Sequence, residues 1–102
     1  MQILERHIQK IKNADAFTEA EKKWLALEKR LGGFPPKRHY DVISGRDESG
    51  TRVWEREWDS LAAIEAAYGR LFDEPEAKSL SGNDIVLSEQ IEFYGVVEDF
   101  RS

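Results

Sequence analysis

The sequence predicts an α+β fold in which two helices cover one face of a four-stranded antiparallel sheet. Three observations lead to this prediction. The chain has 102 residues, of which 40% are apolar, and this suits one two-layer core. Segments of alternating polarity and segments with apolar residues every three or four positions follow one another as strand, helix, strand, strand, helix, strand. Glycine and proline clusters separate these segments. We expect a single domain over residues 1–102.

The first strand is predicted over residues 3–11, where side chains alternate between two faces and neither face is purely apolar. Asn13 or Asp15 can cap the helix that follows. Gly32-Gly33 and Pro35-Pro36 end that helix near residue 31. Its apolar stripe recurs at spacings of three and four, at Phe17, Ala20, Trp24, Leu27 and Leu31.

The second and third strands are predicted over residues 37–44 and 51–58, joined by a hairpin loop between Gly45 and Gly50. Asp59 or Ser60 then caps the second helix, which ends near Pro75. Residues 76–87 predict a short helical turn and a loop, and residues 88–97 predict the last strand. The second helix carries an apolar stripe of Leu61, Ile64, Ala67, Tyr68, Leu71 and Phe72.

This order of elements is the split βαβ pattern of a ferredoxin-like sandwich. Right-handed crossovers favour the strand order 4-1-3-2. Two helices cover only one face of such a sheet, so large apolar side chains on the other face indicate sheet-to-sheet pairing in a homodimer. Because a chain of this length has little room for a deep pocket, we expect a sizeable site to need a second chain.

Composition excludes several classes of protein. The absence of cysteine excludes disulfides, thiolate catalysis and cysteine-ligated metal sites. A net charge of −5 argues against a nucleic-acid binder, since phosphate contacts need a basic face. The longest apolar runs are too short to span a membrane, so we expect no membrane partner and a cytoplasmic location. Phosphate-binding glycine loops and nucleophile elbows have no matching motif.

Three segments together resemble the dimeric α/β-barrel superfamily, and most of all its NIPSNAP-like and antibiotic-biosynthesis-monooxygenase-like groups. They are residues 3–12, which lead straight into a helix, residues 31–36 (Leu-Gly-Gly-Phe-Pro-Pro) and residues 55–67. The most specific element is the strand that ends in Trp58, followed by Asp59-Ser60 and a helix rich in Leu, Ala and Glu. The resemblance implies a homodimer whose two sheets enclose a cavity, which some relatives use for polycyclic phenols or haem.

Two strand registers remain open at this stage. The resemblance places Trp58 toward the cavity, and Trp54, Arg56 and Arg52 then share its face with Glu5, His7 and Gln9. Glu55 and Glu57 would then face the helices, where Arg6 and Lys10 of the first strand could offset their burial. The reverse register places Glu55 and Glu57 in the cavity and both tryptophans beneath the helices.

His7 and Glu5 are the candidate catalytic residues, as a general base and the carboxylate that tunes it. The alternative, which the pattern favours for His7, is a histidine hydrogen-bonded within a polar sheet face, with Glu5 paired to Arg56. The candidate ligand-binding residues are Trp54, Arg56, Trp58, Tyr40 and Tyr94. The tryptophans and Arg56 also suit a dimer interface, and strand tyrosines are often cross-strand partners.

His39 is expected on an edge strand, where polar residues discourage aggregation. No spacing of histidines and carboxylates predicts a metal site. We expect no cofactor, with haem at His7 or His39 as the one alternative that the resemblance offers.

Two functional hypotheses follow. In the first, a homodimeric cavity protein of the NIPSNAP-like type binds a small aromatic molecule or a protein partner without catalysis. In the second, a small monooxygenase, either cofactor-independent or haem-linked, acts on an aromatic substrate.

Overall fold

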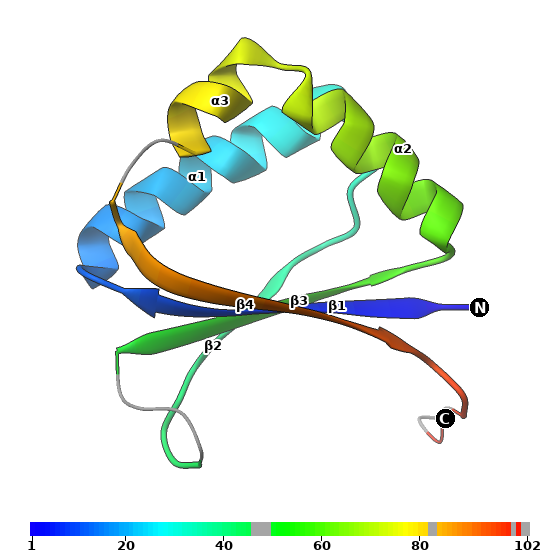
Figure 1. Ribbon diagram of the computed structural model, residues 1–102, viewed down its shortest axis with the longest axis horizontal. Helices are drawn as coiled ribbons and strands as arrows, with labels where there is room; N and C mark the ends of the chain where they lie inside the picture. Colours follow the sequence, from blue (N-terminus) through cyan, green and yellow to red (C-terminus); the bar gives the residue numbers. More distant parts are fainter. Residues whose placement is uncertain (46–49, 82–83, 99, 101–102) are drawn as a thin grey trace.

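The computed structural model describes residues 1–45, 50–81, 84–98 and 100, and it confirms the predicted α+β ferredoxin-like architecture. Figure 1 shows all of the helices on one face of the sheet. The described elements are, in chain order, β1 (Ile3–Ile11), α1 (Ala14–Leu31), β2 (Arg38–Asp41), β3 (Thr51–Trp58), α2 (Leu61–Phe72), α3 (Pro75–Ser81) and β4 (Val86–Gly95).

The sheet has the order β2-β3-β1-β4 with every pairing antiparallel, which confirms the predicted 4-1-3-2 arrangement. β1 lies between β3 and β4, and Glu5 stands opposite Arg56 while His7 stands opposite Trp54. The residues of β1 are therefore surrounded by side chains from strands that are distant in sequence.

The helix starts follow from side-chain caps. Asn13 accepts a hydrogen bond from the amide of Ala16 at 2.9 Å, and Ser60 accepts one from the amide of Ala63 at 3.1 Å. These two residues are the caps, rather than Asp15 and Asp59. After α1, Gly32 has a φ of 76°, a conformation that favours glycine and ends the helix.

Three elements differ in extent from the predictions. β2 is shorter than expected because its pairing with β3 ends where Asp41 meets Arg52. β4 begins and ends two residues earlier than expected, and the predicted turn around Ala77 is the full helix α3. The predicted hairpin loop falls on residues 46–49, and these lie outside the described residues, as do residues 82–83 of the predicted second loop.

The sheet faces are the reverse of the register that the resemblance favoured. Trp54 and Trp58 lie beneath the helices and are almost completely buried. The expectation that Glu55 and Arg6 face the helices is wrong, because the two residues form an ion pair at 2.6 Å on the open face. The physical reason is that burying two indoles gains apolar area, whereas burying two glutamates requires their desolvation.

The apolar core occupies one end of the space between helices and sheet. One cluster joins Ile3 and Trp58 of the sheet to Ile64 and Ala67 of α2. A second cluster joins Leu27, Leu71 and Ala77, one from each helix. At the other end, around His7 and Trp54, this close packing gives way to a cavity.

Candidate functional site

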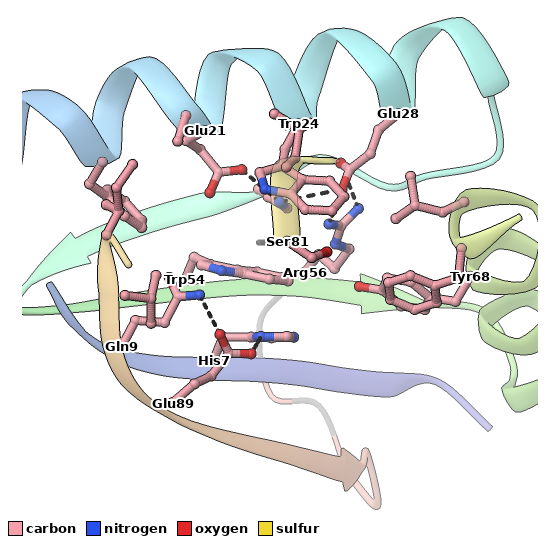
Figure 2. Close-up of a pocket in the computed structure, with 18 of the residues that line it drawn as sticks. His7, Gln9, Glu21, Trp24, Glu28, Trp54, Arg56, Tyr68, Ser81 and Glu89 are labelled. Atoms are coloured by element: carbon pink, nitrogen blue, oxygen red, sulfur yellow. Dashed lines mark hydrogen bonds and ion pairs between the residues drawn. The ribbon is translucent and has the colours of Figure 1, made fainter. Parts of the chain in front are cut away.

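A cavity of about 410 Å³ lies between α1 and the sheet within a single chain. Figure 2 shows that Trp24 and Glu28 reach it from α1, whereas His7, Trp54 and Glu89 reach it from the strands. A single chain therefore has room for a sizeable cavity, contrary to the expectation of little room within one subunit. The polar part of the lining consists of side chains held in ion pairs, and the small Ala20 lines the cavity as well.

The remaining walls of the cavity are aromatic and aliphatic. Trp24, predicted as a core residue, packs against the Leu27 cluster and also lines the cavity. Tyr68 stacks on Phe72 with ring centroids 5.7 Å apart, and Phe72 stays 57% exposed. The lining also includes Phe17, Leu71 and Leu80. These side chains offer mainly apolar surface to a ligand.

His7 lies between two carboxylates. Its Nε2 lies 2.6 Å from Glu5 Oε2, and its Nδ1 lies 3.0 Å from Glu89 Oε1. The ring stacks on Trp54 at a centroid distance of 3.7 Å. Burial opposes the charged form, but the hydrogen bonds to Glu5 and Glu89 outweigh burial and raise the pKa of His7. Both ring nitrogens of His7 thus lie against carboxylates, and the raised pKa favours the charged imidazolium.

Glu5 is the hub of the buried polar network and only 1% exposed. It accepts hydrogen bonds from Trp58 Nε1 at 2.8 Å and from the Tyr68 hydroxyl at 2.5 Å, in addition to His7. Burial alone would raise the pKa of Glu5, but these hydrogen bonds lower it. Burial raises the pKa of Tyr68, which therefore stays a donor. Glu5 ties β1 to β3 and α2 as an ionised carboxylate.

Arg56 and Lys37 complete the network. The buried Arg56 guanidinium donates to both carboxylate oxygens of Glu28, at 3.2 and 3.0 Å. Lys37 Nζ donates to Glu21 at 2.7 Å and lies 4.3 Å from the centroid of the Trp54 ring. Each cation of the cavity is therefore paired with a carboxylate.

Four charged residues of the cavity were not predicted from the sequence: Glu21, Glu28, Lys37 and Glu89. Glu28 carried a usable signal, because it lies four residues after Trp24 and three before Leu31, within the inward stripe of α1. A charged residue at such a spacing indicates a buried partner. Lys37 and Glu89 gave no such signal, since their contacts depend on chain segments that only the fold brings together.

The structure brings together four of the predicted site residues: Glu5, His7, Trp54 and Arg56. It places Trp58 in the packed end, where it contacts Glu5 but does not line the cavity.

Tyr40 and Tyr94 lie on the open face of the sheet, opposite Val53 and Leu4, and do not reach the cavity. The Tyr94 hydroxyl donates to Glu92 at 2.6 Å, and Arg38 lies over the Tyr40 ring. Strand parity decides this placement, since both tyrosines are out of phase with His7 and Trp54.

The histidines do not fit a haem. Both nitrogens of His7 are bonded to carboxylates, and His39 lies outside the cavity on edge strand β2 with its ring against Phe17. Burial lowers the pKa of His39. No group of three or more His, Asp or Glu residues within the described ranges could hold a metal ion.

Comparison with known proteins gives a likeness in structure. No family model matches the sequence, and no curated protein matches it. An uncharacterised NIPSNAP domain protein from Burkholderia xenovorans matches with a TM-score of 0.77 at 15% identity, over 98% of each chain. The chain has the fold of the NIPSNAP-family structures. Among the described helices, none has the length and apolar character to cross a membrane.

Two further structures share this NIPSNAP-like fold. SnoaB from Streptomyces nogalater, a cofactor-independent oxygenase, matches with a TM-score of 0.70 at 16% identity, over 99% of this chain and 98% of SnoaB. A dimeric ferredoxin-like protein of unknown function from Jannaschia sp. matches with a TM-score of 0.66 at 14% identity, over 94% of this chain and 100% of that protein. At these identities the likeness is one of fold, and the neighbours themselves differ in what is known of their function.

Proposed function

We propose that this protein binds a small, largely apolar aromatic molecule in the cavity beneath α1 and does not transform it. The observation that carries the proposal is an aromatic-walled cavity whose acid and base groups are all engaged with one another. A volume of about 410 Å³ falls in the range of small-molecule pockets. Phe72, which lines the cavity and is more than half exposed, gives it an aromatic rim.

The state of His7 argues for binding rather than catalysis. A general base needs a free nitrogen lone pair within reach of the substrate proton. Both ring nitrogens of His7 are engaged with the carboxylates of Glu5 and Glu89, so neither is free to take a proton from a ligand. The carboxylate of Glu5 is likewise occupied by hydrogen bonds, and it is almost completely buried.

Calorimetric titration with 2-naphthylmethanol, a neutral aromatic probe, tests this proposal. Ala20 lines the cavity from α1, so Ala20→Phe fills the space and should abolish binding. Ala26→Phe is the matched control, because Ala26 is exposed on the same helix and does not line the cavity. Equal affinity of the wild type and Ala20→Phe would refute the cavity as the binding site.

The proposal includes a homodimer formed through the open face of the sheet. That face presents partly exposed Leu4, Ile8 and Val53, together with Tyr40 and Tyr94. The dimeric ferredoxin-like neighbour supports this arrangement. Native mass spectrometry at micromolar concentration should give the mass of two chains, and Val53→Arg should give one. A wild-type monomer would refute the dimer while leaving the cavity proposal intact.

A second candidate function is that of a cofactor-independent oxygenase. The observation that favours it is the likeness to SnoaB over nearly the whole chain. Oxygen consumption with 1,4-naphthohydroquinone should then exceed the uncatalysed rate, and His7→Gln should remove the excess. Wild-type protein with no excess over buffer would eliminate this candidate.

A further inference from the structure

The polar wall of the cavity offers acceptors and few donors. Both nitrogens of His7 are engaged, with the carboxylates of Glu5 and Glu89. Arg56 donates to Glu28 from its two terminal nitrogens, and Lys37 donates to Glu21. The buried Nε of Arg56 makes no hydrogen bond with any described residue and lies 3.6 Å from Glu5 Oε1, so it is directed at a carboxylate as well. These cationic donors are therefore already directed at carboxylates, and a ligand that needs donors from them, such as a carboxylate or a ketone, would have to displace an existing ion pair.

Gln9 gives independent evidence of an acceptor site. Its side chain lines the cavity and is only 8% exposed. Nε2 donates to Glu89 Oε2 at 2.8 Å, and this contact fixes the amide orientation because the reverse would place oxygen against oxygen. The other atom, Oε1, is buried and accepts no hydrogen bond from any described residue. A buried acceptor without a donor is costly, and a ligand donor would remove that cost.

The charges of the network add up to an excess of one carboxylate. Even with His7 counted as charged, three cationic side chains face four carboxylates: His7, Lys37 and Arg56 against Glu5, Glu21, Glu28 and Glu89. Arg52, which stands opposite Gln9 on β3, is paired with Asp41 and does not line the cavity. Glu89 is the least enclosed of the four carboxylates, with a side chain that is 32% exposed. The excess negative charge is therefore accessible to a ligand where Gln9 and Glu89 line the cavity.

We propose that the aromatic ligand carries a protonated amine, which lies at the acceptor wall formed by Gln9 and Glu89. An ammonium group supplies donors without requiring any, and it neutralises the excess carboxylate. The ring system occupies the aromatic part of the cavity next to Trp24 and Tyr68. This inference rests on the proposed function and names its ligand class.

Three probes of nearly equal shape test the inference in calorimetric titrations at neutral pH: 2-naphthylmethylamine, 2-naphthylmethanol and 2-naphthoate. The amine should bind about tenfold more tightly than the alcohol, which corresponds to roughly 1.4 kcal/mol. The naphthoate should bind more weakly than the alcohol, because its negative charge is repelled by the excess negative charge of the wall. Added salt should reduce the preference for the amine.

Glu89→Gln tests where the preference arises. The substitution removes one negative charge and keeps the size of the side chain, so the amine should lose most of its tenfold advantage over the alcohol, with both affinities measured on the same variant. Glu92→Gln is the matched control, because it makes the same change on the same strand but on the open face, where Glu92 contacts Gln90 and Tyr94. The control variant should keep the full preference.

The outcomes separate this inference from the proposed function. Binding of the alcohol at an affinity equal to that of the amine, or tighter binding of the naphthoate, overturns the ammonium site and leaves the cavity as an aromatic pocket. Failure of all three probes to bind overturns the proposed function itself. The ranking of probes on wild-type protein decides the question even where Glu89→Gln fails to fold.

Discussion

The two ends of the layer between helices and sheet are built differently. At one end, Trp58 packs among Ile3, Ile64 and Ala67, and large apolar side chains fill the space. At the other end, His7 and Trp54 border a cavity that charged pairs surround. The same two strands, β1 and β3, supply both ends, so a few residues along one strand separate a core from a pocket.

This difference indicates how a chain of 102 residues can hold a pocket. The packed end supplies the apolar burial that stabilises the fold. The hollow end is held open by ion pairs and hydrogen bonds, which fix side chains without filling space. Glu5 joins the two ends, because it bonds Trp58 on one side and His7 on the other. Stability and binding should therefore respond to different substitutions.

The largest expected effect is that of Trp58→Ala in the packed end. Removal of a buried indole leaves a cavity and should lower the free energy of unfolding by about 3–5 kcal/mol. Trp24→Ala is the comparison, because Trp24 is half-buried and already borders empty space, and it should cost about 1–2 kcal/mol. Urea unfolding followed by circular dichroism measures both losses. Equal losses would show that the two ends do not differ in packing.

The next largest effect is that of Glu5→Gln. The amide would turn a donor toward Trp58, Tyr68 or His7 and would leave a buried cation without its partner, at a cost of about 3 kcal/mol. Glu55→Gln is the matched control on the open face. Its ion pair with Arg6 is partly exposed and should contribute less than about 1 kcal/mol. Urea unfolding of both variants gives the two values, and similar losses would refute the role of Glu5 as a hub.

The sequence was enough to predict the fold because each element carries its own local signal. The stripe from Phe17 to Leu31, the cap at Asn13 and the glycines after residue 31 define α1 without any distant contact. The strand order then follows from chain connectivity.

Which face of the sheet lies against the helices could not be predicted in the same way. In β1, Leu4 and Ile8 alternate with Ile3 and Glu5, and both faces mix charged and apolar residues. Which face lies beneath the helices depends on the joint burial of Trp54 and Trp58. This burial arises only when strands and helices pack together. His7 and Glu5 were identified as candidates from the sequence. The hydrogen bonds between His7 and Glu89 and between Tyr68 and Glu5 form only in the assembled fold.

A smaller effect distinguishes the two ends by overpacking. Ala67 is buried against Trp58, so Ala67→Leu should force neighbouring side chains apart and cost about 1–3 kcal/mol. Ala20 borders the cavity, and Ala20→Leu should change stability by less than about 0.5 kcal/mol, since leucine and alanine are both good helix formers. Thermal denaturation of both variants checks this contrast. A costly Ala20→Leu would mean that the cavity end is already filled.

The smallest expected effect is a dependence of stability on pH that originates at the hollow end. The pKa of His7 is raised above its ordinary value of 6.5, so its contribution is complete below that pH and is lost as the pH rises through the raised value. The pKa values of Glu5 and Glu89 are lowered from 4.5, so their contribution is complete above that pH and is lost as the pH falls through the lowered values. The melting temperature should therefore be highest between these two pH values.

His7→Gln should flatten the alkaline decline of the melting temperature, while His39→Gln should leave it in place. Burial lowers the pKa of His39, so the contribution of His39 to stability has the opposite dependence on pH. An alkaline decline that persists in His7→Gln would show that the group responsible lies outside the cavity.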